Sequence, residues 1–186
     1  MLFLTVIFLI VALIVAADFI KTRYKTVLFI GLGLFLFIVA AFRPSTIDRD
    51  YLSYVRLFDE NMRVGEAFIE PSFLLITNFI HRFLFSKVIF LFIFYAGFAV
   101  SIKFIAIKQL SHFWFLSALL YVSYSFLLHD LTQIRAGVSV GVVLLCIKPL
   151  YEWKGITLLL LAFLAIFFHF SAILLLFWWF LDATKI

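Results

Sequence analysis

The sequence predicts an all-α polytopic membrane protein with about six transmembrane helices, a short re-entrant or interfacial helix and an amphipathic helix in one outer loop. Hydrophobic residues make up 67% of the 186 residues, and 27 residues are phenylalanine. The mean hydropathy is +1.23. A soluble core of this size needs far less apolar surface, so lipid is the predicted solvent. The apolar runs are also continuous and longer than the alternating segments, about ten residues each, that build a membrane β-barrel.

Several apolar runs are interpreted as membrane spans, although some are short for a hydrocarbon layer of roughly 30 Å. They lie near residues 2–17, 26–42, 88–107, 112–128, 136–149 and 156–181. The stretch Met1 to Val15 lacks the positive start of a secretory signal, so we expect an uncleaved first span. Neither an internal repeat nor a Pro/Gly/Ser linker interrupts the chain. Residues 1–186 are therefore predicted to form a single transmembrane domain.

The run at 72–85 decides the orientation of everything that follows it. It is short and contains His81 and Arg82, so we interpret it as a segment that does not cross. Six of the eight lysines, together with Arg23, then share the cytoplasmic side, as the positive-inside tendency requires. These residues are Lys21, Arg23, Lys25, Lys103, Lys108, Lys148 and Lys154. The remaining arginines, and both termini, are predicted to lie outside.

The outward-facing loop at about 43–71 is the largest hydrophilic part of the chain. Apolar and aromatic residues recur in it at helical spacing, which predicts an amphipathic helix on the outer surface. They are Tyr51, Tyr54, Val55, Phe58 and Met62. A separate stripe carries Arg49, Arg56 and Arg63. Clustered arginines suit bidentate binding of phosphate or pyrophosphate, so this face is where we look for chemistry.

Several function classes find no support in the sequence. Nucleotide-binding glycine loops, the HExxH zinc motif and the nucleophile elbow are absent. The net charge of +5 is dispersed between apolar runs, which argues against nucleic acid as a partner. The lone Cys146 is predicted to pack, and His81, His112 and His129 lack metal-ligand spacing. We therefore predict neither a metal nor another cofactor.

Arg135 is the first candidate for a functional residue. It opens the fifth predicted span at its outer end, followed by Gly137 and Gly141 at a spacing that lets another helix approach closely. An arginine facing lipid would cost roughly 3 kcal/mol near the centre of the bilayer, so it should face a cavity or a partner. The alternative is an arginine that reaches the interface and is balanced by Asp130.

His169 is the second candidate. If the last span is continuous to Trp178 and Trp179 at the outer interface, the imidazole lies about 12 Å deep at helical rise. A side chain at that depth needs a partner, and its ordinary pKa near 6.5 would let it hold or pass a proton. A hydrogen bond between helices without any chemistry explains the residue equally well.

Three further polar residues lie at span edges or in the loop. Arg43 directly follows the second span, where an interfacial anchor is the commoner role, and Pro44 ends that helix. Asp50 and Glu70 are candidate carboxylates for proton transfer or for binding sugar hydroxyls. In a loop this charged, each carboxylate is individually more often a solvated ion-pair partner.

Five short segments, in this order and spacing, resemble one known family. They are Phe42-Arg43, Asp50-Tyr51 with Tyr54, Glu70-Pro71-Ser72-Phe73, Gln133-Ile134-Arg135-Ala136-Gly137, and Phe168-His169-Phe170-Ser171-Ala172. The family is that of the Wzy-type O-antigen and exopolysaccharide polymerases, in its EpsG-like branch. Asp48 stands where the family usually has a glycine. Because members usually continue through more spans, the resemblance implies an amino-terminal portion or a short form.

The resemblance implies a glycosyltransferase that joins undecaprenyl-pyrophosphate-linked oligosaccharide units at the periplasmic face of the bacterial cytoplasmic (inner) membrane. Catalytic roles would fall to Arg135, His169 and Asp50. Substrate binding would fall to Arg43, Tyr51, Tyr54, Glu70 and Gln133. Implied partners are membrane lipids and the chain-length regulator and flippase of the same pathway. The alternatives are a lipid-linked oligosaccharide flippase or transporter, and a non-catalytic assembly subunit of a polysaccharide export system.

Overall fold

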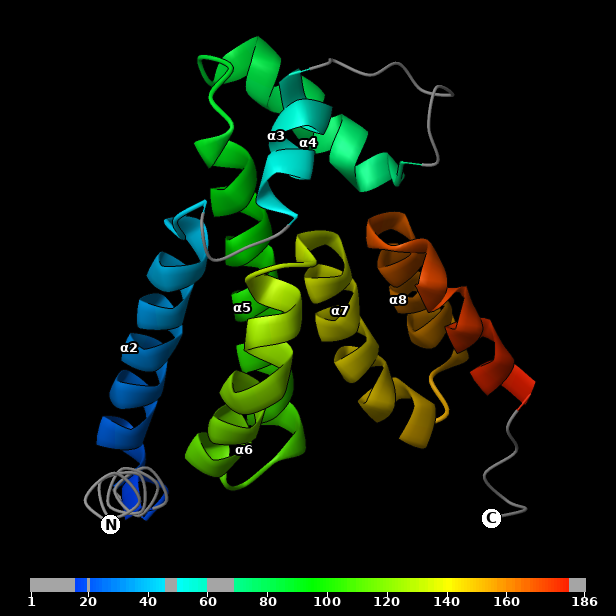
Figure 1. Cartoon of the computed structure of the whole chain (residues 1–186). Helices are drawn as coiled ribbons and strands as arrows, with labels where there is room; N and C mark the ends of the chain where they lie inside the picture. The colour runs from blue at the N-terminus through cyan, green and yellow to red at the C-terminus, as the bar shows by residue number, and fades with distance from the viewer. Residues whose placement is uncertain (1–15, 20, 46–49, 60–68, 181–186) are drawn as a thin grey trace.

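The computed structural model describes residues 16–19, 21–45, 50–59 and 69–180, and every regular element within them is a helix. The order is α2 (Thr22–Ala41), α3 (Tyr51–Asp59), α4 (Pro71–Phe83), α5 (Ile89–Leu110), α6 (Trp114–Leu120), η1 (Tyr121–Asp130), α7 (Ile134–Tyr151), α8 (Gly155–Phe168) and η2 (Phe170–Phe180). Figure 1 shows these helices from N-terminus to C-terminus. The π-helical η1 continues α6, and η2 is a 3-10 helix. The predicted all-α class is confirmed.

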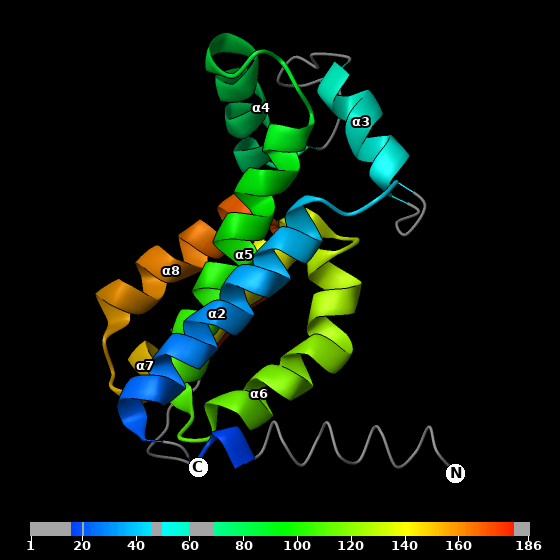
Figure 2. The same ribbon diagram turned by 90° about the vertical axis from the view of Figure 1, so that its left-hand side faces the viewer.

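Helix α5 lies at the centre of the bundle, with α2 and α7 packed against it and α8 packed against α7 (Figures 1 and 2). Three helices, Arg23–Ala41, Ile89–Leu110 and Ile134–Tyr151, are long and apolar enough to cross a membrane. Helix α8 is apolar but shorter. The chain is thus an all-α membrane protein. The predicted run 2–17 lies almost entirely outside the described residues, and the number of six spans stays a prediction.

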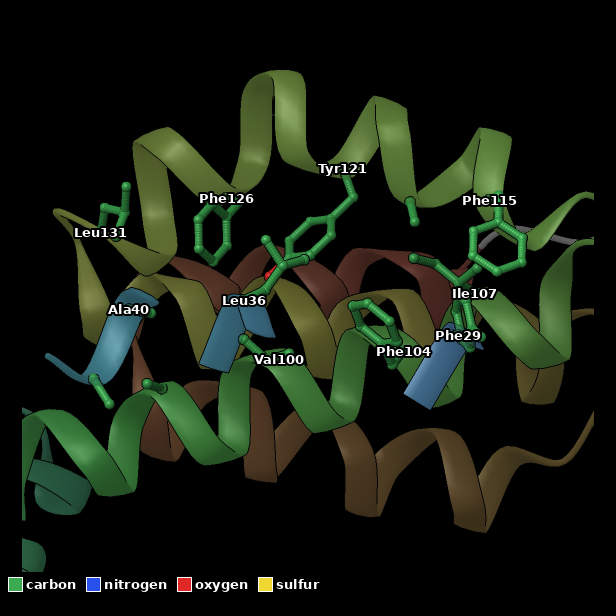
Figure 3. Packing of buried hydrophobic residues seen from close by; sticks show 13 residues of the cluster. Phe29, Leu36, Ala40, Val100, Phe104, Ile107, Phe115, Tyr121, Phe126 and Leu131 are labelled. Carbon is green, nitrogen blue, oxygen red and sulfur yellow. The ribbon is translucent and has the colours of Figure 1, made fainter. Parts of the chain in front are cut away.

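One apolar cluster joins α2, α5 and the α6–η1 segment. Phe29 and Leu36 of α2 meet Phe104 of α5 and Tyr121 and Phe126 of η1, as Figure 3 shows. The Phe29 and Phe104 rings lie 4.4 Å apart. Gly33 permits this closeness, because a Cβ there would lie 3.1 Å from the Phe104 ring. In lipid, where apolar surface gains nothing from leaving water, such close packing is what associates helices.

Helices α3 and α4 lie together at one end of the bundle, which we call the loop end (Figures 1 and 2). Helices α2 and α8 end there, and helices α5 and α7 begin there. Helix α3 buries Tyr54 and Phe58 as its amphipathic pattern predicted, while Met62 lies outside the described residues. The His81 ring stacks on Phe58 at 4.3 Å and its Nε2 lies 2.9 Å from the Phe58 carbonyl oxygen. That this segment does not cross the membrane stays a prediction.

The opposite end, here called the lysine end, carries the start of α2, the end of α5 and the α7–α8 turn (Figure 1). Lys25 there bonds to the His112 carbonyl oxygen at 2.9 Å and pairs with Asp18 at 3.1 Å. The Asp18 carboxylate also accepts the backbone N–H groups of Phe115 and Leu116, each at 3.0 Å. Asp18 thereby caps the N-terminus of α6 from a distant part of the chain.

The predicted single span at 156–181 is wrong. Helix α8 ends at Phe168, His169 is extended with φ −156° and ψ 123°, and η2 turns back to pack against α8 and α7. The predicted depth of His169 assumed that continuous span; instead His169 is the C-cap of α8, whose C-terminal end lies at the loop end (Figure 1). A histidine within a continuous span would need a polar partner among apolar helices. Reversing the chain at His169 puts the imidazole beside polar side chains instead.

Candidate functional site

Three segments that are distant in sequence meet at the loop end: the start of α4, the start of α7 and the break between α8 and η2 (Figure 1). Arg135 donates from Nη1 to Oε2 of Glu70. The other oxygen of Glu70, Oε1, lies 2.6 Å from Nδ1 of His169. We call this arrangement the Arg135–Glu70–His169 triad. The Glu70 side chain is only 5% exposed, whereas those of Arg135 and His169 are 22% and 35% exposed.

Glu70 is placed by the start of α4. Pro71 occupies the first turn of that helix, where its fixed φ and missing N–H are tolerated. The Glu70 carbonyl oxygen accepts the N–H of Phe73 at 3.0 Å, but the Glu70 side chain does not cap the helix. The carboxylate is thus directed away from its own helix, and both of its oxygens serve the triad.

Arg135 is held at the start of α7, where the helix dipole disfavours a positive charge. Glu70 compensates this charge, and the guanidinium also lies 5.7 Å from the ring centres of both Tyr54 and Phe73. The predicted alternative, in which Asp130 balances Arg135, is wrong because Asp130 pairs with Lys103. The prediction that Arg135 faces a partner is confirmed, and that partner is Glu70.

The other residues predicted in the outer loop surround the triad through aromatic contacts. The buried Arg43 lies 4.2 Å from the Phe92 ring centre, and Tyr51 stacks on the same ring at 4.8 Å. Phe92 in turn meets Tyr54 edge to face at 6.5 Å. Arg43 and Arg135 therefore lie at the same end and are linked through these rings. Asp50 stands just before α3, and the bonds that form the triad do not involve it.

Gln133 lines a groove of about 340 Å³ between α7 and η2. The end of η1 contributes His129 to this groove, and His169 of the triad lines it as well. Nδ1 of His129 is buried and has no hydrogen-bond partner among the described residues. Sequence reasoning gave His129 no role, because nothing in its spacing to other histidines indicates that it faces His169.

A second charged cluster was missed in the sequence. Lys103 was predicted near the cytoplasmic end of its span, but it is fully buried and bonds to Oδ1 of Asp130. The Tyr121 hydroxyl donates to the other oxygen, Oδ2. Gly137 accommodates this cluster, since a Cβ there would lie 2.6 Å from Oδ1 of Asp130. A lysine within the predicted span 88–107, with an aspartate just after the predicted span 112–128, was the available signal.

Comparison with known families identifies the chain. The model of the EpsG family matches residues 26–186. The chain belongs to the EpsG family. This EpsG-family match includes every residue of the triad and all five segments that carried the predicted resemblance, which is thereby confirmed. The family and the apolar helices together make this an EpsG-family membrane protein of polysaccharide biosynthesis. Neither the curated proteins nor the solved structures gave a match.

Proposed function

We propose that this EpsG-family protein is a polysaccharide polymerase of the bacterial cytoplasmic membrane, and that it joins oligosaccharide units carried on undecaprenyl pyrophosphate at the periplasmic face. The family supports the polymerase class. The single observation that carries the chemistry is the Arg135–Glu70–His169 triad, in which a buried carboxylate holds an imidazole and a guanidinium side by side. A base next to a cation that can bind phosphate is the pair that such a transfer needs.

In the proposed reaction, Nε2 of His169 takes the proton of an acceptor sugar hydroxyl, and Nδ1–H donates to Glu70. The hydroxyl oxygen bonds to the anomeric carbon of the donor sugar as the bond from that carbon to the phosphate oxygen breaks. The bonding electrons leave with the lipid pyrophosphate, and the proton passes from His169 to water. Glu70 fixes the tautomer and stabilises the imidazolium, as carboxylates do for catalytic histidines.

Arg135 stabilises the charge that develops on the departing pyrophosphate. Glu70 occupies Nη1, so the guanidinium has further N–H groups to offer a ligand on its accessible side. Because arginine remains positive at all relevant pH values, it provides this charge whether or not His169 is protonated. The Tyr54 and Phe73 rings beside it restrict its orientation.

We give Arg43 and Asp50 supporting roles. Arg43 is 5% exposed and lies on Phe92, so we propose that it holds the rings under Tyr51 and Tyr54 in place. Asp50, at the start of α3, would bind an acceptor hydroxyl together with the two tyrosines. Gln133 would bind the phosphate end of the donor from the groove side.

The test is to replace Arg135 with Ala in the native host after deletion of the chromosomal copy. Arg56→Ala is a matched control, because Arg56 is an exposed arginine of α3 at the same end. With equal membrane levels, we expect Arg135→Ala to reduce polymer synthesis by about 10²- to 10³-fold. Single units should remain at the surface, and Arg56→Ala should give a normal ladder on a gel.

Long-chain ladders from Arg135→Ala would contradict the proposed role of the triad. A flippase or transporter would behave differently, because its loss leaves no unit at the outer surface. The two functions therefore separate on the presence of single surface units in the Arg135→Ala strain.

A further inference from the structure

We propose that the groove between α7 and η2 binds the apolar stem of a lipid diphosphate, with the diphosphate beside His169. This inference rests on the proposed function and deepens it, because it assigns the lipid carrier a place in the fold. The groove of about 340 Å³ adjoins the triad through His169, which lines the groove and also bonds to Glu70.

The groove is polar at one end only. Its polar residues at the loop end are His129, Gln133, His169 and Ser171. Further along α7 and η2 the lining becomes Val140, Val143, Leu174 and Leu175. Ser139 also lines this part, but its hydroxyl already donates to the Ala165 carbonyl oxygen at 3.0 Å. A ligand with a polar head at the loop end and an apolar stem along the helices matches this gradient.

An unsatisfied group lies at the polar end. Nδ1 of His129 is buried without a hydrogen-bond partner among the described residues, which costs free energy unless a ligand provides one. A phosphate oxygen would satisfy a protonated Nδ1. Ala136 and Ala172 have small side chains on the two walls, which leaves width for the head where α7 and η2 meet.

Another groove in the bundle lacks these features. The space of about 500 Å³ between α2 and α5 is lined mainly by apolar residues such as Phe29, Phe37 and Phe104. It shares no residue with the triad and suits an ordinary lipid chain. The groove between α7 and η2 combines an apolar wall with histidines next to the proposed reaction centre, so it is the one that we assign to the carrier.

The experiment uses the purified full chain in phosphatidylcholine nanodiscs, with radiolabelled undecaprenyl diphosphate as the probe. Val143→Phe fills the apolar part of the groove. Val27→Phe is the matched control, since Val27 is 65% exposed on α2, away from the groove. We expect Val143→Phe to raise the Kd by about tenfold or more, ~1.4 kcal/mol, and Val27→Phe to leave it unchanged.

A second measurement keeps the test decisive if Val143→Phe folds poorly. In a Cys146→Ala background, Val143→Cys is alkylated with an apolar maleimide. Undecaprenyl diphosphate should slow this alkylation several-fold, and phosphatidylglycerol should not. Equal protection by both lipids would mean that the groove holds any membrane lipid, which overturns the proposal. Binding by Val143→Phe as tight as that of the unmodified chain, or no binding to the unmodified chain, would overturn it too.

The two proposals fail in different ways. If the groove variants bind undecaprenyl diphosphate normally while Arg135→Ala stops polymer formation, the groove assignment is refuted and the proposed polymerase function is retained. If Val143→Phe no longer binds undecaprenyl diphosphate while Arg135→Ala still makes long chains, the groove assignment is retained and the proposed function is refuted.

Discussion

Two carboxylates in this bundle are each shared by two side chains, but these partners differ in how exposed they are. Glu70 is shared by Arg135 and His169, and their side chains are 22% and 35% exposed. Asp130 is shared by Lys103 and Tyr121, but the side chains of the Lys103–Asp130 pair are both 0% exposed. The first cluster therefore has donors left for a ligand, whereas the second is sealed. The difference supports the proposed role of Glu70 in the reaction, whereas Asp130 connects helices of the bundle.

The sealed cluster joins three helical segments. Lys103 comes from α5, Tyr121 and Asp130 come from the two ends of η1, and Gly137 of α7 lies against the carboxylate. Polar bonds between helices hold a membrane bundle together and also fix its register. The start of α7, and with it Arg135, is positioned on this support.

Asp130→Leu should produce the largest effect on stability. It leaves the Lys103 ammonium buried without its carboxylate, and breaking a buried pair on one side costs about 3–5 kcal/mol. We expect a strongly reduced membrane level and a lower Tm in detergent. The double variant Lys103→Met with Asp130→Leu should recover most of the loss, because no charge is left without a partner. If Asp130→Leu alone were as stable as the unmodified chain, the structural role of this cluster would be refuted.

Glu70→Gln should damage activity much more than stability. The amide can still hydrogen bond, but it no longer holds the imidazole tautomer or offsets the Arg135 charge. We expect polymer formation per folded molecule to fall by about 10²- to 10⁴-fold, with a smaller loss of Tm than Asp130→Leu gives. Ladder length and Tm are measured on the same preparations. If Glu70→Gln lowers Tm as much as Asp130→Leu and keeps full activity, the two clusters do not differ as stated.

Gly137→Ala tests how tightly the sealed cluster is packed. The added Cβ would lie 2.6 Å from Oδ1 of Asp130 and 3.2 Å from the His129 carbonyl oxygen, so the η1–α7 connection must shift. Overpacking of this kind costs about 1–3 kcal/mol. Gly31→Ala is the matched control, because a Cβ at Gly31 meets nothing within 4 Å. Thermal unfolding of both variants should show a loss for Gly137→Ala alone, and equal Tm values would refute the tight fit.

Asp18→Asn should have the smallest effect, and one that depends on pH. Burial opposes ionisation of Asp18, but the N–H groups of Phe115 and Leu116 and the Lys25 ammonium outweigh it and lower the pKa below 3.8. The stabilisation is therefore complete above the ordinary pKa and is lost as the pH falls through the lowered one. We expect a loss of about 1 kcal/mol at neutral pH.

The measurement for Asp18→Asn is the Tm at neutral pH and at acid pH. The difference from the unmodified chain should shrink on acidification, once the parent carboxylate is protonated as well. Asp59→Asn, at an exposed carboxylate of α3, is the control and should differ little from the parent at neutral pH. A difference for Asp18→Asn that stays constant down to strong acid would argue against the charged cap.

The long apolar runs allowed α2, α5 and α7 to be predicted within a few residues, because length and hydropathy are local properties. A partner for Arg135 was predictable, because an arginine that faces lipid costs free energy. The structure provides this partner as Glu70. The identity of that partner was not predictable, since Glu70 is 65 residues away and is brought there only by the packing of α4. The reversal at His169 has neither proline nor glycine to mark it, so the run 156–181 looked continuous.

The wide turns of η1 carry a consequence for tolerated changes in length. Its bonds from Leu131 to Phe126 and from Gln133 to Leu128 span five residues instead of four. Deleting one residue between 122 and 129 would allow this segment to form ordinary α-helical turns. The hydropathy profile of the chain would hardly change. In an α-helix the same deletion would turn all following residues by about 100° around the helix axis. In η1 the wide turns contain the extra residue, so Asp130 can keep roughly its direction relative to Tyr121. The loss of one residue within this short stretch is therefore predicted to be less harmful than the same loss within α5 or α7.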